Sequence, residues 1–184
     1  APERIRILPH PTPKFAFESP VEDEQQVLSR MGIEPGYLFY PAQFWPHKNH
    51  ANLLRAVKLL REEFGIQIPL VLVGSDKGQQ ATYIRKLAAD LGVEAQLKLL
   101  GFVSQDELRV LYRNAFALTY VTWFGPENLP PLEAFAAGCP VIASNVPGSE
   151  EQLGTAAMLV DGGSPQSIAS AVQSLHEDTP LRES

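Results

Sequence analysis

Residues 37–74 have the sequence YLFYPAQFWPHKNHANLLRAVKLLREEFGIQIPLVLVG. This stretch begins with an apolar run from Tyr37 to Pro41 and ends with a second from Leu70 to Gly74. Between the two runs, apolar residues recur at the spacing of one helix face: Leu53, Val57, Leu60 and Phe64. A strand, a helix with one apolar stripe and a second strand indicate a βαβ unit in a parallel sheet.

The same alternation continues to the C-terminal part of the chain. Further strands are predicted at 97–100, 115–121, 141–144 and 157–160, and most are apolar throughout, as expected of strands covered on both faces. Helical spacing links Ile84, Leu87, Ala88 and Leu91, and again Leu108, Leu111, Tyr112 and Ala115. The pattern predicts an α/β fold, a Rossmann-like three-layer domain with a mostly parallel sheet of about six strands flanked by helices.

Local start and stop signals agree with this prediction. Ser104 and Glu107 form a capping-box pair, and Ser164 followed by Pro165 is a helix start. Gly92 and Gly138 stand where helices should end. We assign 37–176 to the domain, 1–36 to a Pro-rich linker or domain edge with a strand near 5–8 and a short helix near 25–31, and 177–184 to a frayed tail.

Composition excludes several classes of function. The net charge of −6 and the lack of a basic cluster argue against a nucleic-acid partner or an anionic lipid surface. The apolar runs are shorter than the roughly 20 residues of a transmembrane helix. One cysteine, Cys139, cannot form an internal disulfide, which favours a reducing, cytoplasmic location, with membrane association of a full-length protein left open.

Ligands of open α/β sheets bind beyond the carboxyl ends of the strands, and the segment 40–50 follows such an end. Asn49 is predicted to cap the next helix, which would place Lys48 near its free N–H groups and positive dipole. That combination suits a diphosphate, although Lys48 could equally be an ordinary surface lysine.

A second segment, 124–134, has the sequence FGPENLPPLEA. Asn128 or a neighbour is predicted to cap the following helix, leaving the N–H groups near Leu129 and Leu132 for an anion. Glu133 is predicted in the first helical turn, where it either accepts hydrogen bonds from a ribose diol or complements the dipole.

Other candidate sites are weaker. The turn 101–104 follows a strand, and its backbone could meet a base edge. No Gly-x-Gly-x-x-Gly follows a strand, and 74–78 lacks P-loop spacing. His47 and His50 have no third ligand at recognisable spacing, so no metal site is predicted. Cys139 is predicted to be buried packing rather than a nucleophile.

Together these segments resemble the retaining glycosyltransferases of family 4, whose GT-B architecture pairs two Rossmann-like domains across a cleft. The resemblance runs in order from about 37 to 175 and includes PAQFWPHKN, LVLVG, GFVS, LPPLEA and GCPVIAS. Residues 5–13 are similar to the segment that joins the two domains of that family.

The resemblance implies that this chain is the C-terminal, nucleotide-sugar-binding domain of such an enzyme. It implies that Lys48 contacts the diphosphate and that Glu133 contacts the ribose. These two are the candidate catalytic residues. The backbone of Asn128, Leu129 and Pro130 would meet phosphates and sugar hydroxyls, and that of Phe102 and Val103 would meet the base. Gly74, in the matching LVLVG segment, is a further candidate donor-binding residue. No metal and no other cofactor is implied.

The chain departs from the family pattern at two positions. The phosphate-binding arginine of the family is Gln43 here, so that contact is missing or supplied elsewhere. The earlier glutamate of the usual pair is Gly125, and Glu127, two residues on, is either its substitute or a solvated loop acid.

A glycan, lipid or small-molecule acceptor would bind an N-terminal domain outside this chain, and the fragment alone is expected not to turn over. The fold would also suit a non-catalytic nucleotide-binding module or another GT-B enzyme, such as a sugar-nucleotide epimerase or a phosphorylase.

Overall fold

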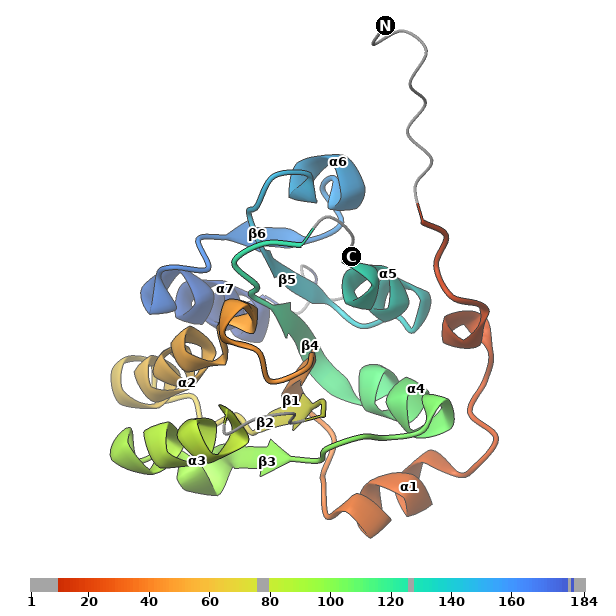
Figure 1. The fold of residues 1–184 in the computed structure, drawn as a ribbon, viewed down its shortest axis with the longest axis horizontal. Coiled ribbons are helices and arrows are strands. Elements are labelled where there is room, and N and C mark those ends of the chain that lie inside the picture. The colour runs from red at the N-terminus through yellow and green to blue at the C-terminus, as the bar shows by residue number, and fades with distance from the viewer. Residues whose placement is uncertain (1–9, 76–79, 126–127, 179, 181–184) are drawn as a thin grey trace, which may run out of the picture.

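A computed structural model describes residues 10–75, 80–125, 128–178 and 180. These residues form three layers, with a parallel sheet between two layers of helices (Figure 1). The strands are β1 (Tyr37–Pro41), β2 (Leu70–Val73), β3 (Leu97–Leu99), β4 (Ala115–Tyr120), β5 (Val141–Ser144) and β6 (Met158–Val160). Their order is β3-β2-β1-β4-β5-β6, and every neighbouring pair is parallel, which confirms the predicted Rossmann-like sheet.

Two groups of helices cover the sheet. The helices are α1 (Glu24–Met31), α2 (His50–Glu63), α3 (Gln80–Asp90), α4 (Gln105–Arg113), α5 (Leu129–Ala136), α6 (Ser149–Leu153) and α7 (Pro165–Glu177). Helix α2 packs against α3 and α7 on one side, while α4 packs against α5 and α1 on the other (Figure 1). Short 3-10 turns, η2 (Lys14–Phe17), η3 (Pro46–Lys48) and η4 (Glu94–Gln96), complete the described elements.

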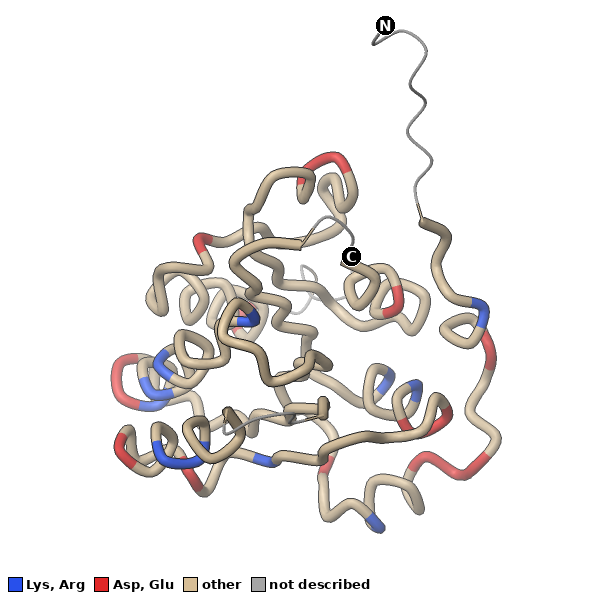
Figure 2. Tube along the Cα trace, in the orientation of Figure 1, with Lys and Arg blue, Asp and Glu red and all other residues tan. Residues whose placement is uncertain are grey.

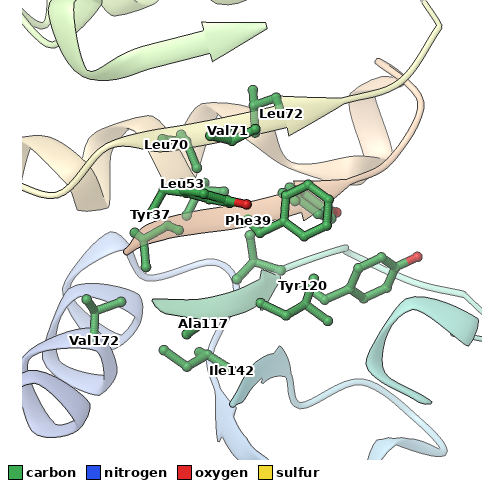
Figure 3. Packing of buried hydrophobic residues seen from close by; sticks show 14 of the residues in the cluster. Tyr37, Phe39, Leu53, Leu70, Val71, Leu72, Ala117, Tyr120, Ile142 and Val172 are labelled. Atoms are coloured by element: carbon green, nitrogen blue, oxygen red, sulfur yellow. The ribbon is translucent and has the colours of Figure 1, made fainter. Parts of the chain in front are cut away.

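The core lies where the central strands meet the helix stripes. Figure 3 shows Phe39 of β1 between Leu72 of β2 and Ala117 of β4, with Val172 of α7 below. Strands β1, β2 and β5 are buried almost throughout, whereas the edge strand β3 is only partly buried. Continuous apolar runs therefore mark strands covered on both faces, as predicted.

The structure confirms predicted helix boundaries at both N-terminal and C-terminal ends. The Ser104 hydroxyl and the Glu107 carboxylate form a complete capping box at α4, and Ser164 caps α7 by accepting from the Ser167 N–H. Gly92 and Gly138 adopt positive φ angles of 69° and 71° just beyond α3 and α5. Glycine makes these left-handed helix ends possible without steric cost.

The segment before β1 packs onto α4. Val27 and Leu28 of α1 are buried, and Arg109 of α4 reaches back to the Glu18 carboxylate at 2.9 Å. Arg113 pairs with Glu24 at 2.7 Å. This part of 1–36 is therefore attached to the domain, while the strand predicted at 5–8 lies outside the described residues.

Charged residues are spread over the helices and loops. Figure 2 shows basic residues on several helices and no single basic face in the described chain. Among the described residues, no helix combines the length and the hydrophobicity that a membrane crossing requires.

Candidate functional site at the carboxyl edge of the sheet

The candidate site lies where the strand order reverses. β1 pairs with β2 on one side and with β4 on the other, so the loops that leave β1 and β4 diverge at this point. Open α/β sheets bind ligands at such a switch point, beyond the carboxyl ends of the strands. The two loops, 42–49 and 121–128, contain the two segments singled out in the sequence.

Backbone and side-chain hydrogen bonds join these loops. The Trp123 N–H donates to the His47 carbonyl at 2.9 Å, and the Thr122 hydroxyl donates to the same carbonyl at 3.1 Å. The Asn49 amide donates to the Val121 carbonyl at 2.9 Å. Segments that are distant in the sequence therefore form one rim of the sheet.

Asn49 has a different role from the predicted one. Its φ of 58° is left-handed, and its side chain makes no capping hydrogen bond to α2. The buried amide instead donates to the carbonyls of Val121 and Gly162, at 2.9 and 2.7 Å. The prediction that Asn49 caps α2 is wrong, because its side chain bridges three loops instead.

Lys48 lies at the end of η3, two residues before α2. Its ammonium donates to the Tyr120 hydroxyl at 3.0 Å, and Nζ is 5.3 Å from the centroid of that ring. The Tyr40 hydroxyl donates to the Lys48 carbonyl at 2.8 Å. Tyrosines from β1 and β4 therefore fix both the backbone and the charged end of Lys48.

Glu133 is buried on α5, with 8% of its surface exposed. Because α5 begins at Leu129, Glu133 is its fifth residue, and the prediction that it lies in the first turn is wrong. The Tyr112 hydroxyl donates to Glu133 Oε2 at 2.7 Å. Burial raises the pKa of the Glu133 carboxyl, and the hydrogen bond from Tyr112 opposes that rise.

The tyrosine partners of the two charged residues come from elements that pack together, α4 and β4. Burial is the main cause that raises the pKa of Tyr112, followed by the Glu133 carboxylate, with smaller effects of Cys139 and Tyr120. Helix α5, which carries Glu133, packs on β4 and α4. Lys48 and Glu133 are thus both held beside β4, Lys48 by its hydrogen bond to Tyr120 and Glu133 by the packing of α5.

Asn128 stands at the N-cap position of α5 but makes no side-chain cap, so of the predicted capping by Asn128 or a neighbour, the Asn128 alternative is wrong. Its amide group donates to the Gly125 carbonyl at 3.4 Å, and its Oδ1 is buried without a partner. Pro130 and Pro131 have no N–H group, so Leu129 and Leu132 supply the amides of this turn. Glu127 lies outside the described residues.

Gly74 is required by close packing of the loops after β1 and β2. A Cβ at this position would lie 2.2 Å from the Ala42 carbonyl oxygen and 3.0 Å from the Cα of Gln43. The Gly74 N–H also donates to the Gly101 carbonyl at 2.9 Å, which joins the ends of β2 and β3. Gln43 is exposed beside this junction.

The third segment, the turn 101–104, has one side chain packed on the core and one exposed to solvent. Val103 packs against the hydrophobic core, whereas the Phe102 side chain is 88% exposed. Phe102, Trp45, Trp123 and Phe124 are large exposed side chains that all follow a strand at the carboxyl edge.

Comparison with known proteins shows the family of this chain. Residues 23–184 match the family described as Glycosyl transferases group 1. The chain belongs to this family. It is 32% identical over 145 residues to the O-antigen chain mannosyltransferase B of Escherichia coli, covering 78% of this chain and 38% of that protein.

Solved structures of glycosyltransferases share the fold of this group 1 domain. WaaG, a glycosyltransferase involved in lipopolysaccharide biosynthesis, aligns with a TM-score of 0.80 and 22% identity, over 100% of this chain and 50% of WaaG. Anabaena Alr3699/HepE, crystallised with UDP and glucose, aligns with a TM-score of 0.77 and 20% identity, over 91% of this chain and 46% of HepE. The relatives named here are glycosyltransferases, which favours that class over an epimerase or a non-catalytic module.

The two histidines that flank Lys48, His47 and His50, both lie against aromatic rings. His47 stacks on Phe124 at 4.7 Å between ring centroids, and His50 is buried against Tyr40 and Phe44. Burial, with a smaller effect of Lys48, lowers the pKa of His50 to about 4. Within the described ranges, no three His, Cys, Asp or Glu residues are grouped as metal ligands would be.

A depression of about 570 Å³ lies at the other edge of the sheet. Phe64, Phe116 and His176 line it, next to the amino ends of β1 and β4. Ligands of this fold bind at the opposite, carboxyl edge, so the depression is not the candidate site.

Tyr112 and Tyr120 were not predicted to take part in the site. Tyr112 was assigned to an apolar helix stripe and Tyr120 to a buried strand, and both are indeed buried. A buried tyrosine hydroxyl usually has a hydrogen-bond partner, so each was a sign that a polar group lies close by. The partners, Glu133 and Lys48, became visible only in the structure.

Proposed function

We propose that the carboxyl edge of this domain binds the nucleoside diphosphate of a sugar-nucleotide donor. The domain would be the C-terminal half of a GT-B, family 4 glycosyltransferase that transfers the sugar with retention. One observation carries the proposal: Lys48 and Glu133, chosen from separate sequence segments, both lie beside β4, and each is held by a hydrogen bond to a tyrosine. An ammonium and a carboxylate match the two ends of such a ligand, a diphosphate and a ribose.

Lys48 supplies the charge for the diphosphate in this proposal. Because Asn49 does not cap α2, its side chain does not occupy the first backbone N–H groups of that helix. The ammonium and the positive end of α2 would stabilise negative charge that builds up on the departing diphosphate. This is electrostatic stabilisation rather than proton transfer, and it requires no metal ion.

The remaining contacts of the donor are assigned to the backbone. The chain of Asn128, Leu129 and Pro130 would meet phosphate and sugar oxygens at the start of α5. The backbone of Phe102 and Val103 would meet the base, next to Gly101, whose carbonyl accepts the Gly74 N–H. Gln43 is neutral, so it cannot supply the second positive charge of an arginine at that position.

The acceptor is assigned to the rest of the protein. This chain spans 38% of the mannosyltransferase to which it is similar and 50% of WaaG. We propose that the remainder forms a second Rossmann-like domain, which holds a glycan, lipid or small-molecule acceptor across the cleft in the cytoplasm.

Calorimetric titration of the 184-residue chain with UDP, GDP and ADP tests the donor site. We expect weak but measurable binding of at least one nucleoside diphosphate in buffer that contains EDTA, with little change when Mg²⁺ is added. Absence of binding by all three would refute the donor site. Binding that appears only with Mg²⁺ would refute the metal-independent form of the proposal.

Substitution of Glu133 tests the ribose contact. Glu133→Gln should weaken UDP binding by about 1.5–3 kcal/mol, the range for a hydrogen bond to a charged group, because an amide presents one acceptor and no charge. Binding of 2′-deoxy-UDP should fall less, since it lacks one of the hydroxyls. Glu150→Gln, an exposed acid of α6, serves as the matched control. Equal losses for both nucleotides would assign Glu133 a structural role.

A further inference from the structure

The carboxylate of Glu133 has two oxygens in different situations. Oε2 accepts the Tyr112 hydroxyl at 2.7 Å, in a contact that is buried on both sides. Oε1 has no hydrogen-bond partner among the described residues, and it is not one of the buried, unpartnered atoms found there. Of the two oxygens, Oε1 is therefore the one open to a further partner.

The ring of Tyr112 is itself held firmly. Its edge packs against Phe39 of β1, with centroids 5.0 Å apart and planes at 87°. The residue is 1% exposed. Because the ring is fixed, its hydroxyl defines one direction in space, and the bonded carboxylate can rotate only by breaking that hydrogen bond.

We propose that Tyr112 is a positioning residue, which holds Oε2 of Glu133 so that Oε1 alone is presented to the ribose hydroxyls. The inference rests on the proposed donor site and adds to it a residue and an orientation. Tyr112 does not touch the nucleotide; it acts through Glu133.

Charge supports the same arrangement. Burial penalises the ionised form of Glu133, and the Tyr112 hydrogen bond favours it. Tyr112 donates rather than accepts here, because burial and the neighbouring carboxylate raise its pKa well above the usual tyrosine range. The phenol therefore stays protonated and keeps Glu133 an acceptor.

Tyr112→Phe removes the hydroxyl and keeps the ring. The ratio of the Kd values of 2′-deoxy-UDP and UDP, titrated into the same sample, measures recognition of the ribose and does not depend on the folded fraction. We expect this ratio to fall about 3- to 10-fold in Tyr112→Phe, the usual net effect of one hydrogen bond. In the Glu133→Gln background, Tyr112→Phe should change the ratio much less, because the two act as one unit.

Tyr37→Phe is the matched control. The Tyr37 hydroxyl also donates to α4, to the Leu111 carbonyl at 2.8 Å, and is equally buried, but it does not contact Glu133. This variant should keep the wild-type ratio. If Tyr112→Phe keeps it too, or lowers both affinities equally, the positioning role is refuted while the donor site stands. If wild type binds UDP and 2′-deoxy-UDP equally, the ribose contact itself is refuted.

Discussion

Replacing Lys48 with alanine is expected to weaken nucleoside diphosphate binding by about 1.5–3 kcal/mol, which is roughly a 10- to 150-fold increase in Kd. The loss should be large because the structure places this ammonium at the switch point of the sheet and because Gln43 adds no second cation. Binding of the nucleoside alone, which carries no phosphate, should change little. Calorimetric titration of the variant with UDP and with uridine provides both values.

The outer face of α2 offers a control for this substitution. Lys58 is a partly exposed lysine of α2 that pairs with Glu62 at 2.8 Å, and Lys58→Ala removes the same charge from a site ten residues further along the chain. This control should leave UDP binding close to wild type. A loss of similar size in Lys58→Ala would mean that net charge, rather than a phosphate contact, decides affinity. Equal losses of UDP and uridine binding in Lys48→Ala would also contradict the assigned role.

The fold could be predicted from local patterns in the sequence. The apolar runs that became β1 and β5 were assigned to their observed ends, because strands covered on both faces leave no room for polar residues. The Ser104 capping box and the glycines after α3 and α5 fixed helix ends in the same way, since each depends on residues within a few positions. Local chemistry decides such boundaries, so a single sequence is enough.

Only part of the candidate site could be predicted from the sequence. Position beyond a strand end marked Lys48 and Glu133 as candidates, because parallel strands bring their carboxyl ends to one edge, but it left a structural role open for each. The family resemblance supplied the contacts assigned to them. Sequence could not show that Asn49 bridges to the Val121 and Gly162 carbonyls, since both lie far along the chain. The same distance hid the tyrosine partners of Lys48 and Glu133. The cap at Asn49 was predicted from residue type alone. In the structure, its side chain instead donates hydrogen bonds to distant loops.

Replacing Asn49 with alanine is expected to lower the free energy of unfolding by about 2–4 kcal/mol. Two effects combine: the Val121 and Gly162 carbonyls lose the buried amide that donates to them, and alanine must adopt a left-handed φ of 58°. Urea unfolding followed by circular dichroism measures the change as a lower midpoint at unchanged m-value.

Asn49→Gly separates the two effects, because glycine adopts the left-handed conformation without a Cβ but makes no side-chain hydrogen bond. It should be destabilised by about 1 kcal/mol less than Asn49→Ala. Asn52→Ala, which removes longer bonds of 3.2 and 3.5 Å to the Gly162 and Gly163 carbonyls, should cost less than either. If both Asn49 variants unfold at the wild-type midpoint, the bridge does not hold the loops together. If they are destabilised as expected, their UDP affinity should also fall, since the loop that Asn49 anchors is the one that carries Lys48.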